Sequence, residues 1–85
     1  MMKVVHCKSG VPYDVYIGRP SMWGNPFKIG VDGTREEVIK KFEEFYLMDG
    51  WMQAHIGELK GKTLGCYCYP LACHGDVLVK YAEAV

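Results

Sequence analysis

Residues 18–33 limit the fold of this chain more than any other segment. The segment is rich in glycine and contains Pro20 and Pro26, so no helix or strand can run through it. A long irregular segment in a compact domain is usually either functional or disordered. Trp23 and Phe27 lie within it and favour an ordered loop. This loop is therefore the first place to look for a binding site.

Regular structure is predicted on both sides of the loop. Residues 3–7 and 13–17 have the pattern of two short strands, which the turn between them could join as a hairpin. After the loop, Thr34 and Glu37 fit a capping box, and apolar residues then recur at helical spacing. The elements predicted from here on are a helix over residues 34–48, a short helix over 51–56 closed by Gly57, a strand over 63–68 stopped by Pro70, and a last helix that begins near His74.

The order of these elements predicts one small α+β domain over residues 1–85. We expect a two-layer α/β sandwich in which two or three helices pack on a three- or four-stranded sheet. A chain of 85 residues has room for a single core. Because such a core is small, a bound ligand, a metal ion or a homo-oligomer would help to stabilise it.

Charge and composition exclude several classes of partner. Ten basic side chains balance ten acidic ones, and the pI is near 6.8. Nonspecific binding to duplex nucleic acid needs a basic surplus, so no duplex partner is expected, and single-strand binding through the aromatic residues is the weakest alternative. The sequence shows no apolar run long enough to span a membrane and no secretory signal, so we expect a cytoplasmic protein without a membrane partner.

Residues 66–74 contain three cysteines and a histidine. Cys66 and Cys68 would point to one face of a strand, and Cys73 and His74 would return from the next loop, so the four side chains could form a tetrahedral zinc site. Structural zinc sites usually spread two ligand pairs over a longer stretch, however. The alternative is a set of reduced thiols packed as small apolar side chains. Zinc is the one cofactor that the sequence suggests.

Arg19 and the start of the last helix predict an anion site. Arg19 follows a predicted strand directly, where a guanidinium can bind phosphate or carboxylate through two N–H groups. The first N–H groups of a helix lack intrahelical partners and lie at the positive end of its dipole. We therefore expect the backbone of residues 74–76 to face Arg19. His74 would add a donor and Gly75 would allow close approach, whereas Asp76 would accept from a ribose-like hydroxyl or only cap the helix.

The loop itself offers groups that could recognise a base. Trp23 or Phe27 could stack on a planar ring, and the amide of Asn25 could read its edge as donor and acceptor. The alternative is a packed loop in which both aromatic residues fill the core and Asn25 makes a turn.

Catalysis by Cys73 or His74 stays open. A helix N-terminus would lower the pKa of Cys73 and enlarge its thiolate fraction, and His74 could act as its base. Neighbouring residues on a helix point apart, however, so this pair needs a favourable loop geometry.

Five segments resemble a family of uncharacterised proteins, domain of unknown function number 4326, whose members occur in bacteria and their phages. These segments are residues 16–20, 23–27, 33–39, 61–68 and 73–78, and together they extend over most of the chain. The resemblance points to Arg19, Trp23, Asn25, Pro26, Phe27, Cys66, Cys68, Cys73, His74, Gly75 and Asp76. It implies a phage or prokaryotic origin, hence the host cytoplasm for a phage protein, and names no reaction.

Together, these observations predict a protein that binds a small anionic, nucleotide-like ligand. The ligand would lie between the loop at residues 19–27 and the N-terminus of the last helix. Two other functions remain as alternatives. One is a structural zinc module that uses Cys66, Cys68, Cys73 and His74 and acts in protein interaction. The other is a nucleotide-processing hydrolase or transferase.

Overall fold

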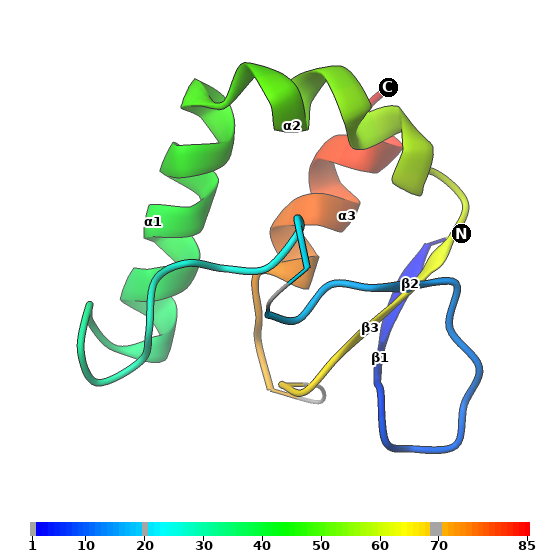
Figure 1. Cartoon of the computed structure of the whole chain (residues 1–85), viewed down its shortest axis with the longest axis horizontal. Helices are drawn as coiled ribbons and strands as arrows, with labels where there is room; N and C mark the ends of the chain where they lie inside the picture. The colour runs from blue at the N-terminus through cyan, green and yellow to red at the C-terminus, as the bar shows by residue number, and fades with distance from the viewer. Residues whose placement is uncertain (1, 20, 69–70) are drawn as a thin grey trace.

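The computed structural model describes residues 2–19, 21–68 and 71–85, and the predicted roles of Pro20 and Pro70 fall outside these ranges. In chain order the elements are β1 (Lys3–His6), β2 (Val15–Tyr16), α1 (Arg35–Met48), α2 (Gly50–His55), the 3-10 helix η1 (Ile56–Leu59), β3 (Thr63–Cys66) and α3 (Gly75–Glu83). This arrangement confirms the predicted small α+β class, and Figure 1 shows α3 between α1 and the sheet.

The sheet has the strand order β1-β3-β2, and both outer strands run parallel to β3. The expected hairpin between residues 3–7 and 13–17 is therefore wrong, because each of these segments pairs with β3. Asp14 gives the physical reason: its N–H donates to the Thr63 carbonyl and its Oδ2 accepts from the Thr63 N–H, both at 2.8 Å. These two bonds place the start of β2 beside the start of β3, so the strands point the same way.

The helices begin as predicted, and two elements end differently. Thr34 caps α1 with the full capping box, in which the Glu37 N–H donates to Thr34 and the Glu37 carboxylate accepts from the Thr34 N–H. Gly57 lies inside η1, which continues directly from α2, so it does not close the short helix. Strand β3 ends at Cys66, and Tyr67 beyond it is 56% exposed. The last two residues of the predicted strand therefore belong to the following turn.

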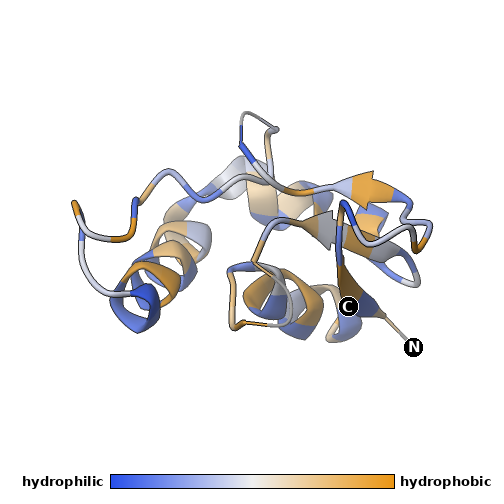
Figure 2. Cartoon of the chain, turned by 90° about the horizontal axis from the view of Figure 1, so that it is seen from below, coloured by the Kyte–Doolittle hydropathy of each residue, from blue (hydrophilic) through white to orange (hydrophobic). Residues whose placement is uncertain are grey.

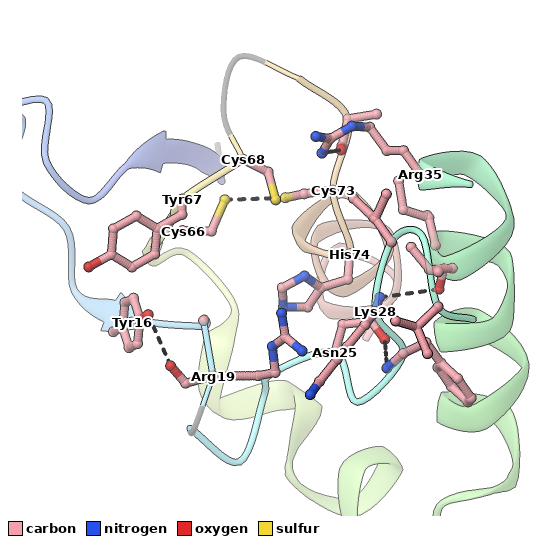
Figure 3. A pocket seen from close by; sticks show the side chains of 17 residues that line it. Tyr16, Arg19, Asn25, Lys28, Arg35, Cys66, Tyr67, Cys68, Cys73 and His74 are labelled. Carbon is pink, nitrogen blue, oxygen red and sulfur yellow. Dashed lines mark hydrogen bonds between the residues drawn. The ribbon is translucent and has the colours of Figure 1, made fainter. Parts of the chain in front are cut away.

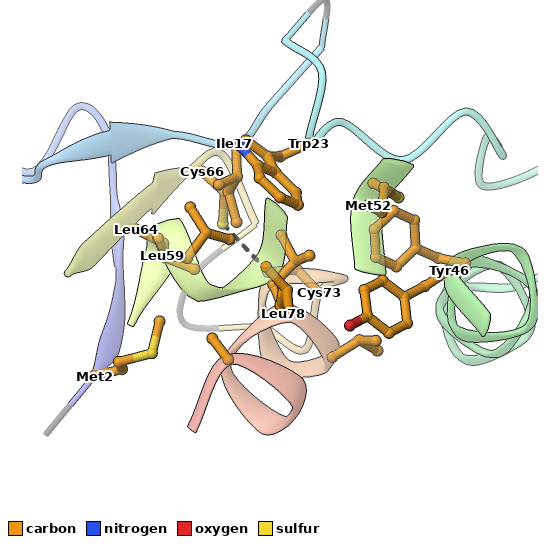
Figure 4. Close-up of a cluster of buried hydrophobic side chains, with 14 residues drawn as sticks. Met2, Ile17, Trp23, Tyr46, Met52, Leu59, Leu64, Cys66, Cys73 and Leu78 are labelled. Carbon is orange, nitrogen blue, oxygen red and sulfur yellow. Dashed lines mark hydrogen bonds between the residues drawn. The ribbon is translucent and has the colours of Figure 1, made fainter. Parts of the chain in front are cut away.

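The core lies between the sheet and the helices. Figure 2 shows that the helices carry both apolar and polar residues, which is the pattern of helices that bury one face. The buried cluster in Figure 4 includes Met2, Ile17, Trp23, Tyr46, Met52, Leu59, Leu64, Cys66, Cys73 and Leu78. No helix in the described ranges has the length and apolar character needed to cross a membrane.

Helices α1 and α3 are also joined at their partly exposed edge. Glu43 Oε2 accepts from Lys80 Nζ at 2.8 Å and from Tyr81 Oη at 2.6 Å. These hydrogen bonds, with that from Lys80 the larger, lower the pKa of Glu43. The rings of Tyr46 and Tyr81 stack beside them with centroids 4.6 Å apart. A polar contact and an aromatic contact thus hold the same helix pair together.

Gly75 lets the first turn of α3 approach the sheet closely. A Cβ atom at this position would lie 2.8 Å from Ile17 Cδ1, 3.0 Å from Val4 Cγ2 and 3.1 Å from Cys73 Sγ. All three distances are shorter than ordinary contacts between carbon or sulfur atoms. The start of α3 can therefore pack on β1 and on the residue after β2 only without a side chain here.

Replacing Gly75 with alanine should destabilise the protein, because the added methyl group overpacks this contact. The expected loss in the free energy of unfolding is about 1–3 kcal/mol, measured by urea denaturation. Gly50→Ala is the matched control, since Gly50 is also the first residue of a helix and a Cβ there meets no atom within 4 Å. Equal stability of the two variants would contradict this account of Gly75.

Candidate functional site

The loop predicted as the binding region is held in place by its own hydrogen bonds. Asn25 Nδ2 donates to the Val38 carbonyl at 3.1 Å, and Asn25 Oδ1 accepts from the Phe27 N–H at 2.9 Å. Both ends of this amide therefore tie the loop to α1 and to itself. Asn25 therefore positions the loop, and its amide keeps one further N–H and one further lone pair on the side of the pocket that it lines.

The N–H groups at the start of α3 already have partners within the chain. The Gly75 N–H donates to Cys73 Sγ at 3.2 Å, and the Asp76 N–H donates to the Cys73 carbonyl at 3.0 Å. Asp76 Oδ2 in turn accepts from the Cys73 N–H at 3.3 Å, which favours its capping role over contact with a hydroxyl of a ligand. These internal bonds leave the N–H groups of Gly75 and Asp76 with little capacity to hold an anion.

His74 fastens the start of α3 to the end of β2. The side chain is 7% exposed, and its Nε2 lies 2.7 Å from the Ile17 carbonyl oxygen, which can only accept. Burial lowers the pKa of His74, against the opposing effect of hydrogen bonds to the carbonyls of Ile17 and Trp23. His74 is therefore a buried neutral side chain that joins two elements, and its Nε2 is not available as a base for Cys73.

Cys66 and Cys73 form a buried thiol pair beside His74. Their sulfur atoms are 3.3 Å apart, so one thiol donates to the other. This hydrogen bond, followed by burial, raises the pKa of Cys73. The expected lowering of this pKa by the helix N-terminus is thus reversed, because the neighbouring thiol and the dry surroundings outweigh the Gly75 N–H. Cys73 is a protonated thiol and a poor nucleophile here.

Within the described residues, His74 does not join the three cysteines of the predicted zinc site. His74 is directed at the Ile17 carbonyl, away from the sulfur pair formed by Cys66 and Cys73. Within residues 2–19, 21–68 and 71–85, no three His, Cys, Asp or Glu side chains are placed so that they could hold a metal ion.

A pocket of about 800 Å³ opens between the end of the sheet, the loop and α1, and we call it the cationic pocket. Its described lining consists of Tyr16, Gly18, Arg19, Asn25, Phe27, Lys28, Ile29, Val31, Arg35, Val38, Ile39, Cys66, Tyr67, Cys68, Ala72, Cys73 and His74. Arg19, Asn25, Phe27 and His74 from the predicted set are among these residues. Gly75 and Asp76 are not.

Three basic side chains from three separate segments line the cationic pocket. Arg19 follows β2, Lys28 belongs to the loop, and Arg35 is the first residue of α1. In Figure 3 the Arg19 guanidinium lies beside His74, and Lys28 and Arg35 lie on the side of α1. Arg35 Nη1 donates to the Ala72 carbonyl at 3.0 Å, which fixes its guanidinium near the turn before α3. None of the described lining residues is Asp or Glu.

The aromatic residues that line the pocket differ from those expected. Trp23 is 8% exposed, packs against Trp51 with ring centroids 5.4 Å apart, and is not in the lining. Its placement agrees with the alternative of a core residue. Tyr16 and Tyr67 line the pocket instead, together with Phe27, and the rings of the two tyrosines meet edge to face at 6.1 Å.

Sequence reasoning missed ten residues of this lining, namely Tyr16, Gly18, Lys28, Ile29, Val31, Arg35, Val38, Ile39, Tyr67 and Ala72. Arg35 was hidden within the capping box, where a charged residue is ordinary. The sequence did carry one signal, because Arg19 and Arg35 are its only arginines and both reach the same pocket. The two tyrosines gave no separate signal, since aromatic residues next to strands are common.

The buried imidazole of His74 predicts a fall in stability on mild acidification. Its pKa is below the ordinary 6.5, so the unfolded chain binds a proton more readily than the folded one. The free energy of unfolding that comes from this difference is fully present above the ordinary pKa. It is lost as the pH falls through the lowered pKa of the folded state. We therefore expect a smaller free energy of unfolding at about pH 5 than at about pH 7.5, measured by urea denaturation.

His74→Gln keeps an amide donor and removes the titration, so its stability should vary less over this pH range. His55→Gln is the control, because His55 is a half-buried histidine on α2, outside the pocket lining. A His74 variant with the full pH dependence of the original protein would show that another group is responsible.

Comparison with known proteins places the chain among viral relatives of unknown role. It is 39% identical over 71 residues to an uncharacterised 12.4 kDa protein from the nrdA-td intergenic region of Enterobacteria phage T4, covering 78% of this chain and 64% of that protein. It is 38% identical over 90 residues to an uncharacterised protein of Acanthamoeba polyphaga mimivirus, covering 85% of this chain and 68% of that protein.

The chain thus spans slightly less than two thirds of the phage relative's length. No solved structure matches it. The family model described as Domain of unknown function (DUF4326) matches residues 2–84, and the chain therefore belongs to that family.

Proposed function

We propose that the cationic pocket binds a small anionic ligand of the nucleotide type. The observation that supports this most is the convergence of Arg19, Lys28 and Arg35 on one pocket whose described lining contains no acidic side chain. The whole chain has a formal net charge of zero, so this positive charge is local. A concave site lined by one sign of charge attracts the opposite sign more strongly than an open surface does.

The two arginines are suited to binding phosphate groups. A guanidinium presents several N–H donors in a planar fork that matches the oxygens of phosphate. Arg35 uses one of its donors on the Ala72 carbonyl, which orients the rest of the group. Arg19 is exposed and has room to move onto a ligand.

The remaining lining favours a ligand with a planar ring. Tyr16, Tyr67 and Phe27 supply aromatic rings, and Val38 and Ile39 of α1 add an apolar wall. Pockets for small molecules are typically of this kind, with apolar walls and a few charged groups, and with volumes of roughly 300–1,000 Å³. Phosphate and ring together define a nucleotide-like compound.

Calorimetry with AMP, ADP, ADP-ribose and inorganic phosphate tests this proposal. We expect nucleotides to bind more tightly than inorganic phosphate, and binding to weaken as salt is added. Arg19→Ala and Arg35→Gln should each weaken binding roughly tenfold or more. The glutamine keeps a donor for the Ala72 carbonyl, so the fold contact can persist.

Lys62→Ala is the charge-matched control, since Lys62 is exposed in the turn before β3 and lies outside the pocket lining. Its affinity should equal that of the original protein. Absence of binding by all four compounds, or equal weakening by Lys62→Ala and Arg19→Ala, would refute the proposal.

A further inference from the structure

The cationic pocket has exposed apolar surface on the sheet side. Tyr67 follows β3 and is 56% exposed. Its ring meets those of His6 and Tyr16 at interplanar angles of 84° and 89°, so neither of these rings lies parallel to it. Figure 3 places Tyr67 and Tyr16 together on the side away from α1. A planar group could stack on Tyr67 without displacing a stacked neighbour.

A second exposed apolar surface lies on the loop side of the same pocket. Ile29 is 51% exposed and Val31 is 80% exposed, although both line the pocket. The loop holds them through the bridge between Ile29 and Gly33 and through the hydrogen bond from the Gly30 N–H to the Gly33 carbonyl at 2.8 Å. These side chains therefore form a fixed apolar surface next to Lys28.

The basic side chains belong to the same pocket lining as these two surfaces, and Lys28 directly precedes Ile29 in the loop. In Figure 3 the guanidinium of Arg19 lies between the two tyrosines and the α1 side, where Lys28 and Arg35 are found. A mononucleotide has one ring and one anionic end, so it can cover only one of the apolar surfaces while its phosphate meets the basic residues. The pocket volume of about 800 Å³ is in the upper part of the range for small-molecule sites.

We infer that the ligand has two planar groups joined by an anionic bridge, as in a dinucleoside polyphosphate. One group stacks on Tyr67, the other lies against Ile29 and Val31, and the phosphates between them meet Arg19, Lys28 and Arg35. This inference rests on the proposed function, because it assigns a ligand class to the same pocket. It requires no covalent step.

Comparison of ADP with diadenosine diphosphate tests this inference. The two compounds share a diphosphate and differ by a second adenosine, and ADP carries the larger negative charge, so simple charge attraction favours ADP. We expect diadenosine diphosphate to bind at least roughly tenfold more tightly by calorimetry. Tyr67→Ala and the double variant Ile29→Ser/Val31→Ser should each reduce the affinity for diadenosine diphosphate towards that for ADP. Because ADP has a single base, at most one of these variants should weaken the binding of ADP.

Tyr13→Ala is the matched control for Tyr67→Ala, because Tyr13 is also an exposed tyrosine, covers Gly65 of β3, and is outside the pocket lining. It should leave the affinity for both compounds unchanged. Equal affinity of ADP and diadenosine diphosphate would overturn the inference and leave the proposed function intact. Failure of both compounds and of the other nucleotides to bind would refute the proposed function itself.

Discussion

The close contact between the first turn of α3 and the sheet determines the rest of this structure. Gly75 permits the approach, and the hydrogen bond from His74 to the Ile17 carbonyl fixes its direction. The same contact places the Cys66 and Cys73 pair at the base of the cationic pocket and positions the segment before α3, whose Ala72 carbonyl orients Arg35. The core and the candidate site are therefore not independent, and a disturbance of this turn would reach both.

Several side chains that could act on a ligand stabilise the fold. His74, Cys73 and Asn25 have hydrogen-bonding groups that could act on a ligand, but each is engaged by a partner inside the protein. A buried polar group without a partner costs free energy, so such engagement is the usual outcome in a small core. In the proposed function, recognition of an anion belongs to longer side chains that extend from the framework, and their charge needs no burial.

Local patterns in the sequence predicted the helices well, because capping and helical periodicity depend on residues close in the chain. Thr34 with Glu37 located the start of α1, and the start near His74 was also right. The strand partners were not predictable in this way. The bonds between Asp14 and Thr63 that set the parallel direction join residues far apart in sequence, and no short-range pattern indicates them.

The candidate site also combines residues that local sequence patterns indicate with residues that only the tertiary structure brings in. Arg19 and Phe27 could be selected because they lie in a conspicuous loop. Lys28 lies in the same loop but gave no separate signal, whereas Arg35 enters the pocket from the first turn of α1, through tertiary structure alone. Trp23 was misleading, since a tryptophan in a loop looks the same in sequence whether it faces a ligand or the core. Its burial against Trp51 is a tertiary contact, which composition and spacing do not encode.

The central place of β3 has a consequence for how the chain acquires this structure during synthesis. Lys3 of β1 pairs with Thr63, and Val15 of β2 pairs with Leu64, so both early strands lack a neighbour until the late strand has left the ribosome. The backbone hydrogen bonds of α1 are local, but its contacts with α3 also await residues that follow β3. The nascent polypeptide therefore carries two strand segments without a partner until residues 63–66 have been made.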